Sequence, residues 1–424
     1  MSCKCEEIKK GVKVHVIETN KFKTNLFTIF LSVPIERKSV TANALIPAVL
    51  RRGTQKLPTQ ESISIELENM YGATLDGGID KIGDNQVIKF YLETLNDSFL
   101  PTQENLTKKA IELLIDIILN PLVENNGFKK EYVVSEKNTI KRLIEGRIDN
   151  KDMYAYTKCI EAMYQNEPYG LYKYGYIEDL ENINEKNLYE TYLDLISKCK
   201  IDIFLSGDLE EQNTIELIKN NENIKKLQPR EDIHIINSEE NQIKQEVEVK
   251  TIQESKDVTQ GKLVIGLDVN CNKPDSRYST CIYNVILGES ATSKMFQNVR
   301  EKAGLAYSAR STYLRQKNNI FIRAGIEIEN YEKALKIIEE QLDDMKKGKF
   351  TDEDIQNAKK YMISGIKTVQ DEQDSEITYY LGQEISGKQV SFEEYMDKIN
   401  CVSRDEIENI ANSIKINTIY FLRN

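Results

Sequence analysis

The sequence predicts an α+β fold that is built twice, as two homologous α/β halves in which helices pack on a mixed sheet. Two observations favour this fold. Segments of the two halves read alike at a nearly constant offset, so that Phe128-Lys-Lys-Glu131 is matched 222 residues later by Phe350-Thr-Asp-Glu353. Each half also follows the same order of expected elements: strands, two helices, a strand pair, further helices, and a last helix that leads into a strand.

The middle of each half carries the clearest helical patterns. An amphipathic helix is followed by a short loop and then by a long, highly charged helix. The amphipathic helices are expected at Ala110–Ile118 and Ala334–Met345, and the charged helices at Glu131–Arg147 and Thr351–Val369. In the second half, Thr351 and Asp354 form a capping box that fixes the start of the charged helix.

Strands are expected at the beginning, in the middle and at the end of each half, where apolar and β-branched residues alternate or run together. The expected ranges are Lys13–Glu18, Lys23–Val33, Thr74–Leu95 (a pair) and Ile201–Leu205, then Lys262–Val269, Tyr307–Ile328 (a pair) and Thr418–Leu422. A second capping box, Ser403 with Glu406, opens the helix before the last strand.

The two halves are joined by a polar segment. Gln228–Asp257 is rich in Glu, Gln, Asn and Lys, which predicts a solvated connector with one edge strand at Val247–Ile252. We therefore expect an N-terminal repeat at 1–227, a connector at 228–257 and a C-terminal repeat at 258–424.

Composition argues against several classes of function. The 424 residues carry a net charge of −11, which disfavours nucleic acid or an anionic membrane as the main partner. No apolar run reaches the length of about 18 residues that spans a bilayer, and the N-terminus lacks the apolar segment of a secretory signal. The seven cysteines are scattered and odd in number, which favours reduced thiols in the cytoplasm. The five that follow Cys5 lie in apolar contexts and are expected in the core.

Histidine is scarce, and this limits the possible metal chemistry. His15 lies in an alternating, strand-like run and His234 lies in the connector. Neither has a second histidine or a carboxylate one helical turn away, so no His-based zinc site can be drawn. Cys3-Lys4-Cys5 could hold a soft metal, but one Cys-x-Cys without a second pair is weak evidence. The glycine motifs of nucleotide-binding proteins and the Gly-x-Ser-x-Gly motif of serine hydrolases are absent.

Two stretches carry a family resemblance. They are Ala44-Leu-Ile-Pro-Ala48-Val-Leu-Arg-Arg-Gly53-Thr54 and Phe296-Gln-Asn-Val-Arg300-Glu-Lys-Ala-Gly304-Leu-Ala-Tyr307. With them the chain resembles the insulinase/pitrilysin group of zinc peptidases (the inverzincins) and the duplicated processing-peptidase relatives, over essentially its whole length. The second stretch is the more specific. The resemblance implies a duplicated, peptidase-like repeat that forms half of a clamshell.

The resemblance also implies that the metal site has been lost. Catalytic members of the group carry His-x-x-Glu-His on a helix before the Gly-Thr, with two zinc ligands and a general base. Ala44 and Ala48 stand at the histidine positions and Pro47 at the base position, and none of them has a side chain suited to these roles. Glu136 falls near the position of the third ligand and is interpreted as an orphan carboxylate on a solvated helix face. No metal or other cofactor and no zinc-peptidase activity are expected from this chain alone.

Two hydrogen-bond donors flank Gly304. Arg300 is expected at the end of a helix and Tyr307 at the start of the next strand, so that they converge from either side of a tight turn. From residue types alone, Arg300 could equally form a surface ion pair and Tyr307 could belong to the core. The resemblance implies instead that both hold the substrate carbonyl and the developing oxyanion opposite a zinc ion.

Three functions are weighed on these grounds. The first is a non-catalytic subunit that supplies Arg300 and Tyr307 to a zinc-bearing, homologous partner, for proteolysis of peptides or of a precursor. The second is a non-enzymatic, chambered peptide-binding or scaffold protein of the same fold, in which both residues could be replaced without loss. The third, an independent hydrolase with unfamiliar ligands, has little support because histidine is so scarce.

Overall fold

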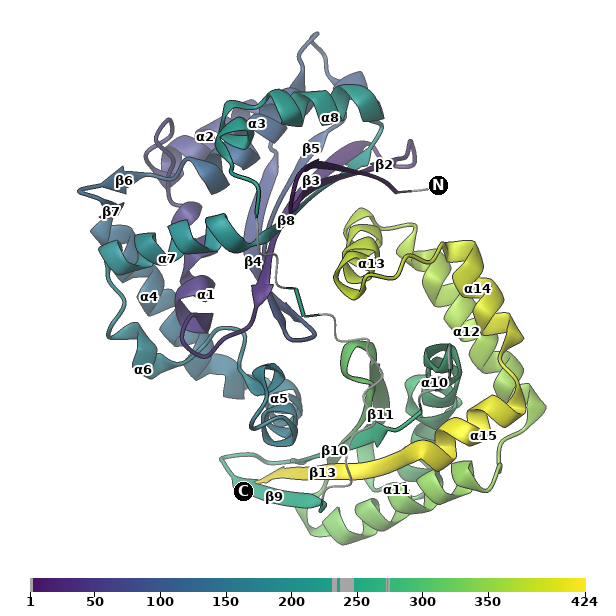
Figure 1. The fold of residues 1–424 in the computed structure, drawn as a ribbon. Coiled ribbons are helices and arrows are strands. Elements are labelled where there is room, and N and C mark those ends of the chain that lie inside the picture. Colours follow the sequence, from purple (N-terminus) through teal and green to yellow (C-terminus); the bar gives the residue numbers. More distant parts are fainter. Residues whose placement is uncertain (1–2, 231–234, 237–247, 272, 274) are drawn as a thin grey trace. The chain divides into compact units, whose positions relative to one another are not determined.

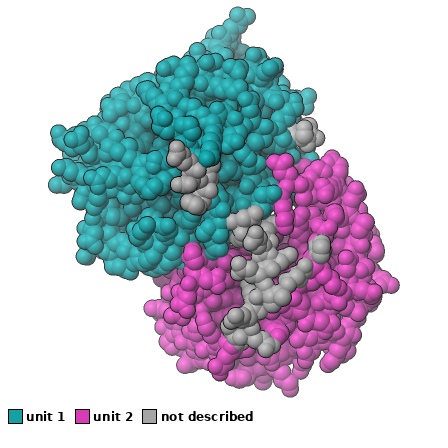
Figure 2. Space-filling model, viewed as in Figure 1, with its two compact units in different colours: residues 1–145, 171–236, 370–387 teal, residues 146–170, 237–369, 388–424 magenta. Residues whose placement is uncertain are grey.

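The computed structural model describes residues 3–230, 235–236, 248–271, 273 and 275–424 (Figure 1). The chain divides into two compact units, shown in different colours in Figure 2. Unit 1 consists of Met1–Glu145, Leu171–Ile236 and Gln370–Gly387, and unit 2 of Gly146–Gly170, Asn237–Val369 and Lys388–Asn424. Each unit therefore takes residues from both halves of the chain. No described helix is long and apolar enough to cross a bilayer.

Unit 1 is built on a six-stranded mixed sheet with the order β1-β2-β8-β3-β5-β4. The strands are β1 (Lys4–Lys9), β2 (Val12–Glu18), β3 (Thr24–Pro34), β4 (Thr74–Ile82), β5 (Asn85–Leu95) and β8 (Lys200–Gly207). β2 and β8 run parallel, and all other neighbours are antiparallel. β8 is buried along its whole length, as expected for a strand covered on both faces.

Unit 2 repeats this topology with five strands in the order β11-β12-β10-β13-β9. They are β9 (Lys250–Ser255), β10 (Gly261–Val269), β11 (Ala306–Leu314), β12 (Asn319–Ile326) and β13 (Ile414–Arg423). Read in this direction, the order matches β4-β5-β3-β8-β2 of unit 1 strand for strand, and β9 with β13 again forms the parallel pair. The predicted α+β fold with two homologous halves is confirmed.

Helices cover both sheets. In unit 1 they are α1 (Val40–Leu50), α2 (Gln60–Asn69), α3 (Leu106–Leu119), α4 (Lys130–Glu145), α6 (Ile177–Leu180), α7 (Glu185–Lys198), α8 (Glu211–Asn220) and α9 (Glu222–Lys226), with a small hairpin of β6 (Val123–Glu124) and β7 (Gly127–Phe128). In unit 2 they are α10 (Ser276–Asn284), α11 (Tyr331–Lys346), α12 (Asp352–Val369), α14 (Phe392–Cys401) and α15 (Arg404–Ser413), with two π-helical segments, η4 (Val285–Glu289) and η5 (Met295–Lys302). Both predicted capping boxes are formed.

The two halves of the chain exchange one helix each. α5 (Lys151–Met163), from the first half, packs on β10 and β13 of unit 2, and α13 (Gln373–Ser386), from the second half, packs on β8 of unit 1. Apolar side chains of α5 share a core with Val264 and Phe321, and those of α13 share one with Phe204. The expected repeats follow the order of the chain, whereas the compact units follow the packing of these two helices.

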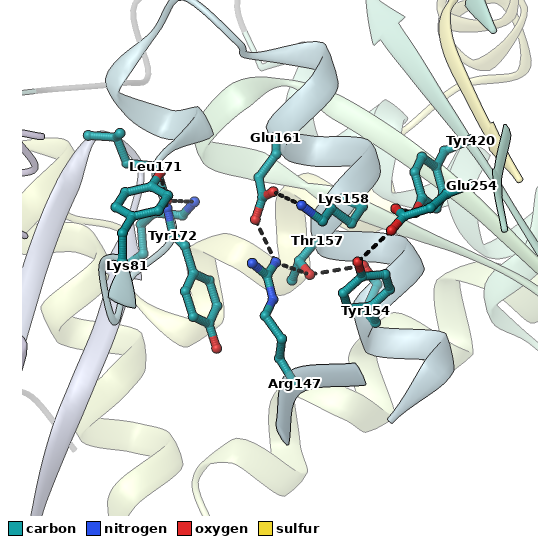
Figure 3. A network of polar contacts seen from close by, with 11 residues as sticks. Lys81, Arg147, Tyr154, Thr157, Lys158, Glu161, Leu171, Tyr172, Glu254 and Tyr420 are labelled. Atoms are coloured by element: carbon teal, nitrogen blue, oxygen red, sulfur yellow. Dashed lines mark hydrogen bonds and ion pairs between the residues drawn. The ribbon is translucent and has the colours of Figure 1, made fainter. Parts of the chain in front are cut away.

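Polar contacts fix both exchanged helices. Within unit 2, the Tyr154 hydroxyl of α5 donates to Glu254 of β9 at 2.9 Å, and Glu254 also accepts from Tyr420 of β13 (Figure 3). Within unit 1, Glu384 of α13 accepts from the ammonium groups of Lys13 (2.9 Å) and Lys200 (3.0 Å). Burial alone would raise the pKa of Glu384, but the two ammonium groups lower it to about 2.

Several smaller predictions can be compared with the structure. His234 and Val247 lie outside the described residues, but the rest of the edge strand predicted in the connector overlaps β9. All seven cysteines are free thiols, and Cys159, Cys199 and Cys271 are buried as expected. The expectation for Cys401 was wrong, because this residue ends α14 on the exposed side of the helix.

Candidate functional site

Helix α1 carries the three positions, Ala44, Pro47 and Ala48, that the sequence resemblance aligns with the metal site of the related peptidases. Ala44 is 1% exposed and belongs to the apolar core of unit 1. Pro47 lies inside the helix and is buried, although its ring nitrogen cannot donate a hydrogen bond to the preceding turn. Ala48 is half-buried. The helix is held by apolar packing, and these three positions have no side-chain atom that could bind a cation or accept a proton.

The carboxylate of Glu136 faces the interior from α4. Its side chain is 8% exposed, and Oε1 accepts a hydrogen bond of 2.6 Å from Nε of Arg52, with Nη2 of the same guanidinium also in contact. Arg52 follows the end of α1 and donates further to Ser135 Oγ (3.0 Å) and Gln60 Oε1 (2.7 Å). The interpretation of Glu136 as an orphan on a solvated face was therefore wrong, because the residue is buried and paired.

In unit 2, Arg300 lies on the π-helical segment η5. Residues at its end make bonds of longer span than in an α-helix, for example from Ala303 N–H to Asn298 O at 3.2 Å. The guanidinium of Arg300 lies over the ring of Phe296, 4.5 Å from the centroid, and its side chain is 42% exposed. Its ion pair with Glu301 is long, at 3.6 Å, and solvated on both sides. Among the described residues, no hydrogen bond engages the guanidinium of Arg300.

Tyr307 is turned outward by the backbone. Gly304 adopts a left-handed conformation with φ of +62°, which ends the helical segment and favours glycine. The register between β11 and β12 then shifts between Ala306 and Ser308, so Tyr307 is the extra residue of a β-bulge on an edge strand. The residue is 83% exposed, which excludes the alternative that Tyr307 belongs to the core. Within the described part of the chain, no hydrogen bond engages its hydroxyl.

Arg300 and Tyr307 together offer charged and neutral donors to an anionic or carbonyl oxygen. Such groups stabilise a developing oxyanion when they are held in place before the reaction. They cannot activate water, and neither the metal nor the general base of the related peptidases has a counterpart at 44, 47 and 48. Both side chains therefore present their donors to solvent, while positions 44, 47 and 48 hold neither a ligand nor a base.

Comparison with known proteins identifies the family to which the chain belongs. A family model described as the Peptidase M16 inactive domain matches residues 182–362. The sequence is 32% identical over 428 residues to the probable inactive metalloprotease YmfF of Bacillus subtilis, which covers 97% of this chain and 96% of that protein. The chain belongs to the M16 peptidase family. This confirms the predicted resemblance to the insulinase/pitrilysin group, with a family model and a relative that are both described as inactive.

Further relatives agree with this assignment. The uncharacterized zinc protease YmxG of Bacillus subtilis is 23% identical, with 79% of each chain covered. Among solved structures, a conserved protein from Enterococcus faecalis superposes with a TM-score of 0.89 at 24% identity, covering 100% of this chain and 99% of that chain. A peptidase M16 inactive domain from Pseudomonas fluorescens gives 0.78 at 17% identity, with 100% and 98% covered. These two structures share the fold.

Zinc does not fit this M16 homologue at the family position. Both positions that the resemblance assigns to histidine ligands are alanines, and Glu136, predicted near the third ligand position, pairs with an arginine. Elsewhere in unit 1, Cys5, His15 and Glu384 bring possible ligand atoms within 4.8 Å of one another. However, Glu384 already accepts two lysine ammonium groups, whose charge opposes a metal cation, and buried His15 is bonded to Asp202 at 3.0 Å. This cluster is better described as an ion-pair network.

The sequence reasoning missed three residues of this M16 homologue. Phe296 could have been found, because it precedes Arg300 by one helical turn. Arg52 could not, because its partner is 84 residues away on another helix. Lys294 lines a cavity of about 120 Å³ between η4 and α12, together with Asp354 and other residues, and burial lowers its pKa. Nothing in its local sequence indicated such a cavity.

Proposed function

We propose that this chain is the non-catalytic subunit of a heterodimeric zinc peptidase. It supplies Arg300 and Tyr307 to a homologous, zinc-bearing partner, and the pair cleaves peptides or a precursor in the cytoplasm. The observation that carries the proposal is the exposure of both donors on irregular backbone, at the end of a π-helical segment and at a β-bulge. Such irregularities cost stability and concentrate at functional sites.

The reaction that each subunit's residues can support explains why two subunits are needed. A guanidinium and a phenol stabilise negative charge on oxygen, but they need a nucleophile delivered by another group. In the related peptidases, two histidines bind zinc and a glutamate acts as the base. The matching positions of this chain are Ala44 and Ala48 for the histidines and Pro47 for the glutamate. The nucleophile must therefore come from a second subunit, with zinc as its resident cofactor and a bound peptide as the substrate.

A mixing experiment tests the proposal. The chain is purified alone and with a homologue from the same genome that carries His-x-x-Glu-His, and each sample is assayed on an unstructured fluorogenic peptide. We expect no turnover by either chain alone and turnover on mixing. Tyr307→Phe should lower kcat of the mixture by about 100-fold, because one oxyanion donor is lost. Tyr361→Phe, at another exposed tyrosine of unit 2, should leave kcat unchanged.

The alternative is a chambered peptide-binding or scaffold protein of the same fold. It predicts that the peptide binds the chain without being cleaved, and that Tyr307→Phe behaves like Tyr361→Phe. Equal activity of these two variants in the mixture, or peptide cleavage by the partner without this chain, would overturn the heterodimer proposal.

A further inference from the structure

One face of the unit 2 sheet carries a group of positive charges beside the edge strand β11. Arg310 of β11 lies directly opposite Arg323 of β12, so both side chains point to the same face. On the next strand, Lys262 of β10 pairs with Gly325, two residues from Arg323, and shares that face because side chains alternate along a strand. Helix α5 packs on this face. The side chains of Lys262, Arg310 and Arg323 are called the basic patch below.

A single carboxylate serves the two arginines. Oδ2 of Asp152, on α5, accepts a hydrogen bond of 2.8 Å from Nη2 of Arg310 and also contacts Nη2 of Arg323. Burial alone would raise the pKa of Asp152, but the two guanidinium groups lower it, so the carboxylate is charged at neutral pH. The side chain of Arg323 is 7% exposed, and a cation buried to this extent needs such a partner. One negative charge cannot also neutralise Arg310.

Lys262 adds a third positive charge. Its ammonium group donates to the neutral amide oxygen of Gln260 at 2.5 Å, and within the described part of the chain it forms no ion pair. The ammonium group lies over the β12 backbone because Gly325 has no side chain, and a β-carbon at Gly325 would come within 3.2 Å of Nζ. Three cations against one carboxylate leave a net charge of +2 here, whereas the whole chain carries −11.

We propose that the basic patch is a subsite for a carboxylate, supplied by an Asp or Glu side chain of a peptide that the chain binds. A guanidinium presents paired donors that match a carboxylate, and Asp152 shows that a carboxylate oxygen fits between these two arginines. The side chain of Arg310 is 55% exposed, and its Nε and Nη1 have no partner among the described residues. Like charges opposite each other destabilise a sheet, so a ligand carboxylate would also relieve the repulsion within the patch.

The subsite lies on the strand that presents Tyr307. Arg310 follows Tyr307 by three residues, which is about 10 Å along an extended strand. The exposed residues Ser308 and Thr312 alternate with buried ones and share the face of Arg310, so their hydroxyl groups flank the guanidinium. A peptide could contact Tyr307 and the basic patch with side chains about three residues apart. The inference rests on the proposed function only in taking a peptide as the ligand, and it holds for the subunit and the scaffold alternatives alike.

The test is peptide binding by the chain alone, measured by isothermal titration calorimetry at low salt. Acetylated and amidated peptides carry one Glu, or Gln of the same shape, at successive positions of an otherwise neutral sequence. We expect the best Glu peptide to bind about tenfold more tightly than its Gln counterpart. Arg310→Gln should abolish this ratio without changing the Kd of the Gln peptide, and Lys262→Gln should reduce the ratio about threefold.

Arg423→Gln is the matched control for loss of an arginine from the same sheet. Arg423 follows Leu422, which pairs with Lys262, so its side chain points to the opposite face and the variant should keep the preference for Glu. Thermal unfolding separates binding from folding. Arg310→Gln should not lower Tm, because Asp152 keeps its contact with Arg323. A lowered Tm would assign Arg310 to the stability of the fold and would count against the proposal.

Equal binding of the Glu and Gln peptides, or binding of neither, would overturn the proposal, as would a preference for Glu that survives Arg310→Gln. A Gln peptide with a free C-terminal carboxylate completes the test. If it binds as tightly as the Glu peptide, the site recognises chain ends and the assignment to an acidic side chain is wrong. Because the measurement involves neither a partner subunit nor turnover, its failure would leave the heterodimer proposal standing, and failure of the mixing experiment would leave this result unaffected.

Discussion

The α1–α4 junction of unit 1 and the turn from η5 to β11 in unit 2 show opposite arrangements of charged and polar side chains. At the junction, regular helices bury Glu136 and satisfy it with Arg52. At the turn, irregular backbone presents Arg300 and Tyr307 to solvent with few partners. The first region is a buried, paired interior, and the second leaves its donors exposed to solvent.

This difference indicates whether the side chains of each region contribute to stability or to contact with a ligand. A buried, paired charge contributes to stability and is costly to break. An exposed donor contributes little to stability, and exposed donors on irregular backbone are typical of positions that contact a ligand. Substitutions should therefore act in opposite ways: those at the turn should reduce activity without changing Tm, and those at the junction should reduce Tm without changing activity.

The largest expected effect is at Arg300. In the mixture with the zinc-bearing partner, Arg300→Ala should lower kcat by about 100- to 1000-fold, because a charged donor to the developing oxyanion is lost. The Tm of the isolated chain should change by less than about 1 °C, since the side chain is solvated. Steady-state kinetics and calorimetry on the same preparation measure both. Arg142→Ala, on the exposed face of α4, is the control for loss of one surface arginine.

The next effect tests whether buried pairs in unit 1 share one behaviour. The pKa of Glu384 is lowered from 4.5 to about 2, so its contribution is complete above about pH 4.5 and is lost as the pH falls toward 2. Glu384→Gln should reduce the free energy of unfolding by on the order of 3 kcal/mol at pH 7. The difference from the natural chain should disappear near pH 2.

Urea unfolding at pH 7, 4 and 3 follows this loss, with Glu190→Gln on the exposed side of α7 as the control. A deficit in Glu384→Gln that does not depend on pH would show that packing of α13, rather than its ion pairs, holds the exchanged helix to the sheet.

Local patterns were enough to predict much of this fold. Hydrophobic periodicity and capping residues located α3, α11, α12 and β13, because these signals act within a few residues. The exchange of α5 and α13 was not predicted, since each is amphipathic and its sequence does not say which sheet receives its apolar face. Likewise, the outward direction of Tyr307 depends on the register of β11 against β12, which is a pairing between segments and not a property of either alone.

A smaller effect concerns how Arg300 is held. Phe296→Leu removes the ring under the guanidinium, 4.5 Å away, and an exposed contact of this type is worth about 0.5–1 kcal/mol. We therefore expect kcat of the mixture to fall by about two- to fivefold with little change in KM, because the Phe296 ring contacts the guanidinium but has no hydrogen-bond donor of its own for a substrate oxygen. Phe99→Leu, at an exposed phenylalanine of unit 1, should have no effect on kcat.

The smallest expected change is the effect on activity of a substitution at the α1–α4 junction. Arg52→Gln should leave kcat of the mixture within about twofold of the natural chain, measured per folded protein at a temperature well below its lowered Tm. The reason is that Arg52 contacts Glu136, Ser135 and Gln60, all of them structural groups of unit 1. If instead kcat fell as far as it does for Arg300→Ala while most of the protein remained folded, the junction would be part of the catalytic machinery, and the separation of a stabilising region from a binding region would fail.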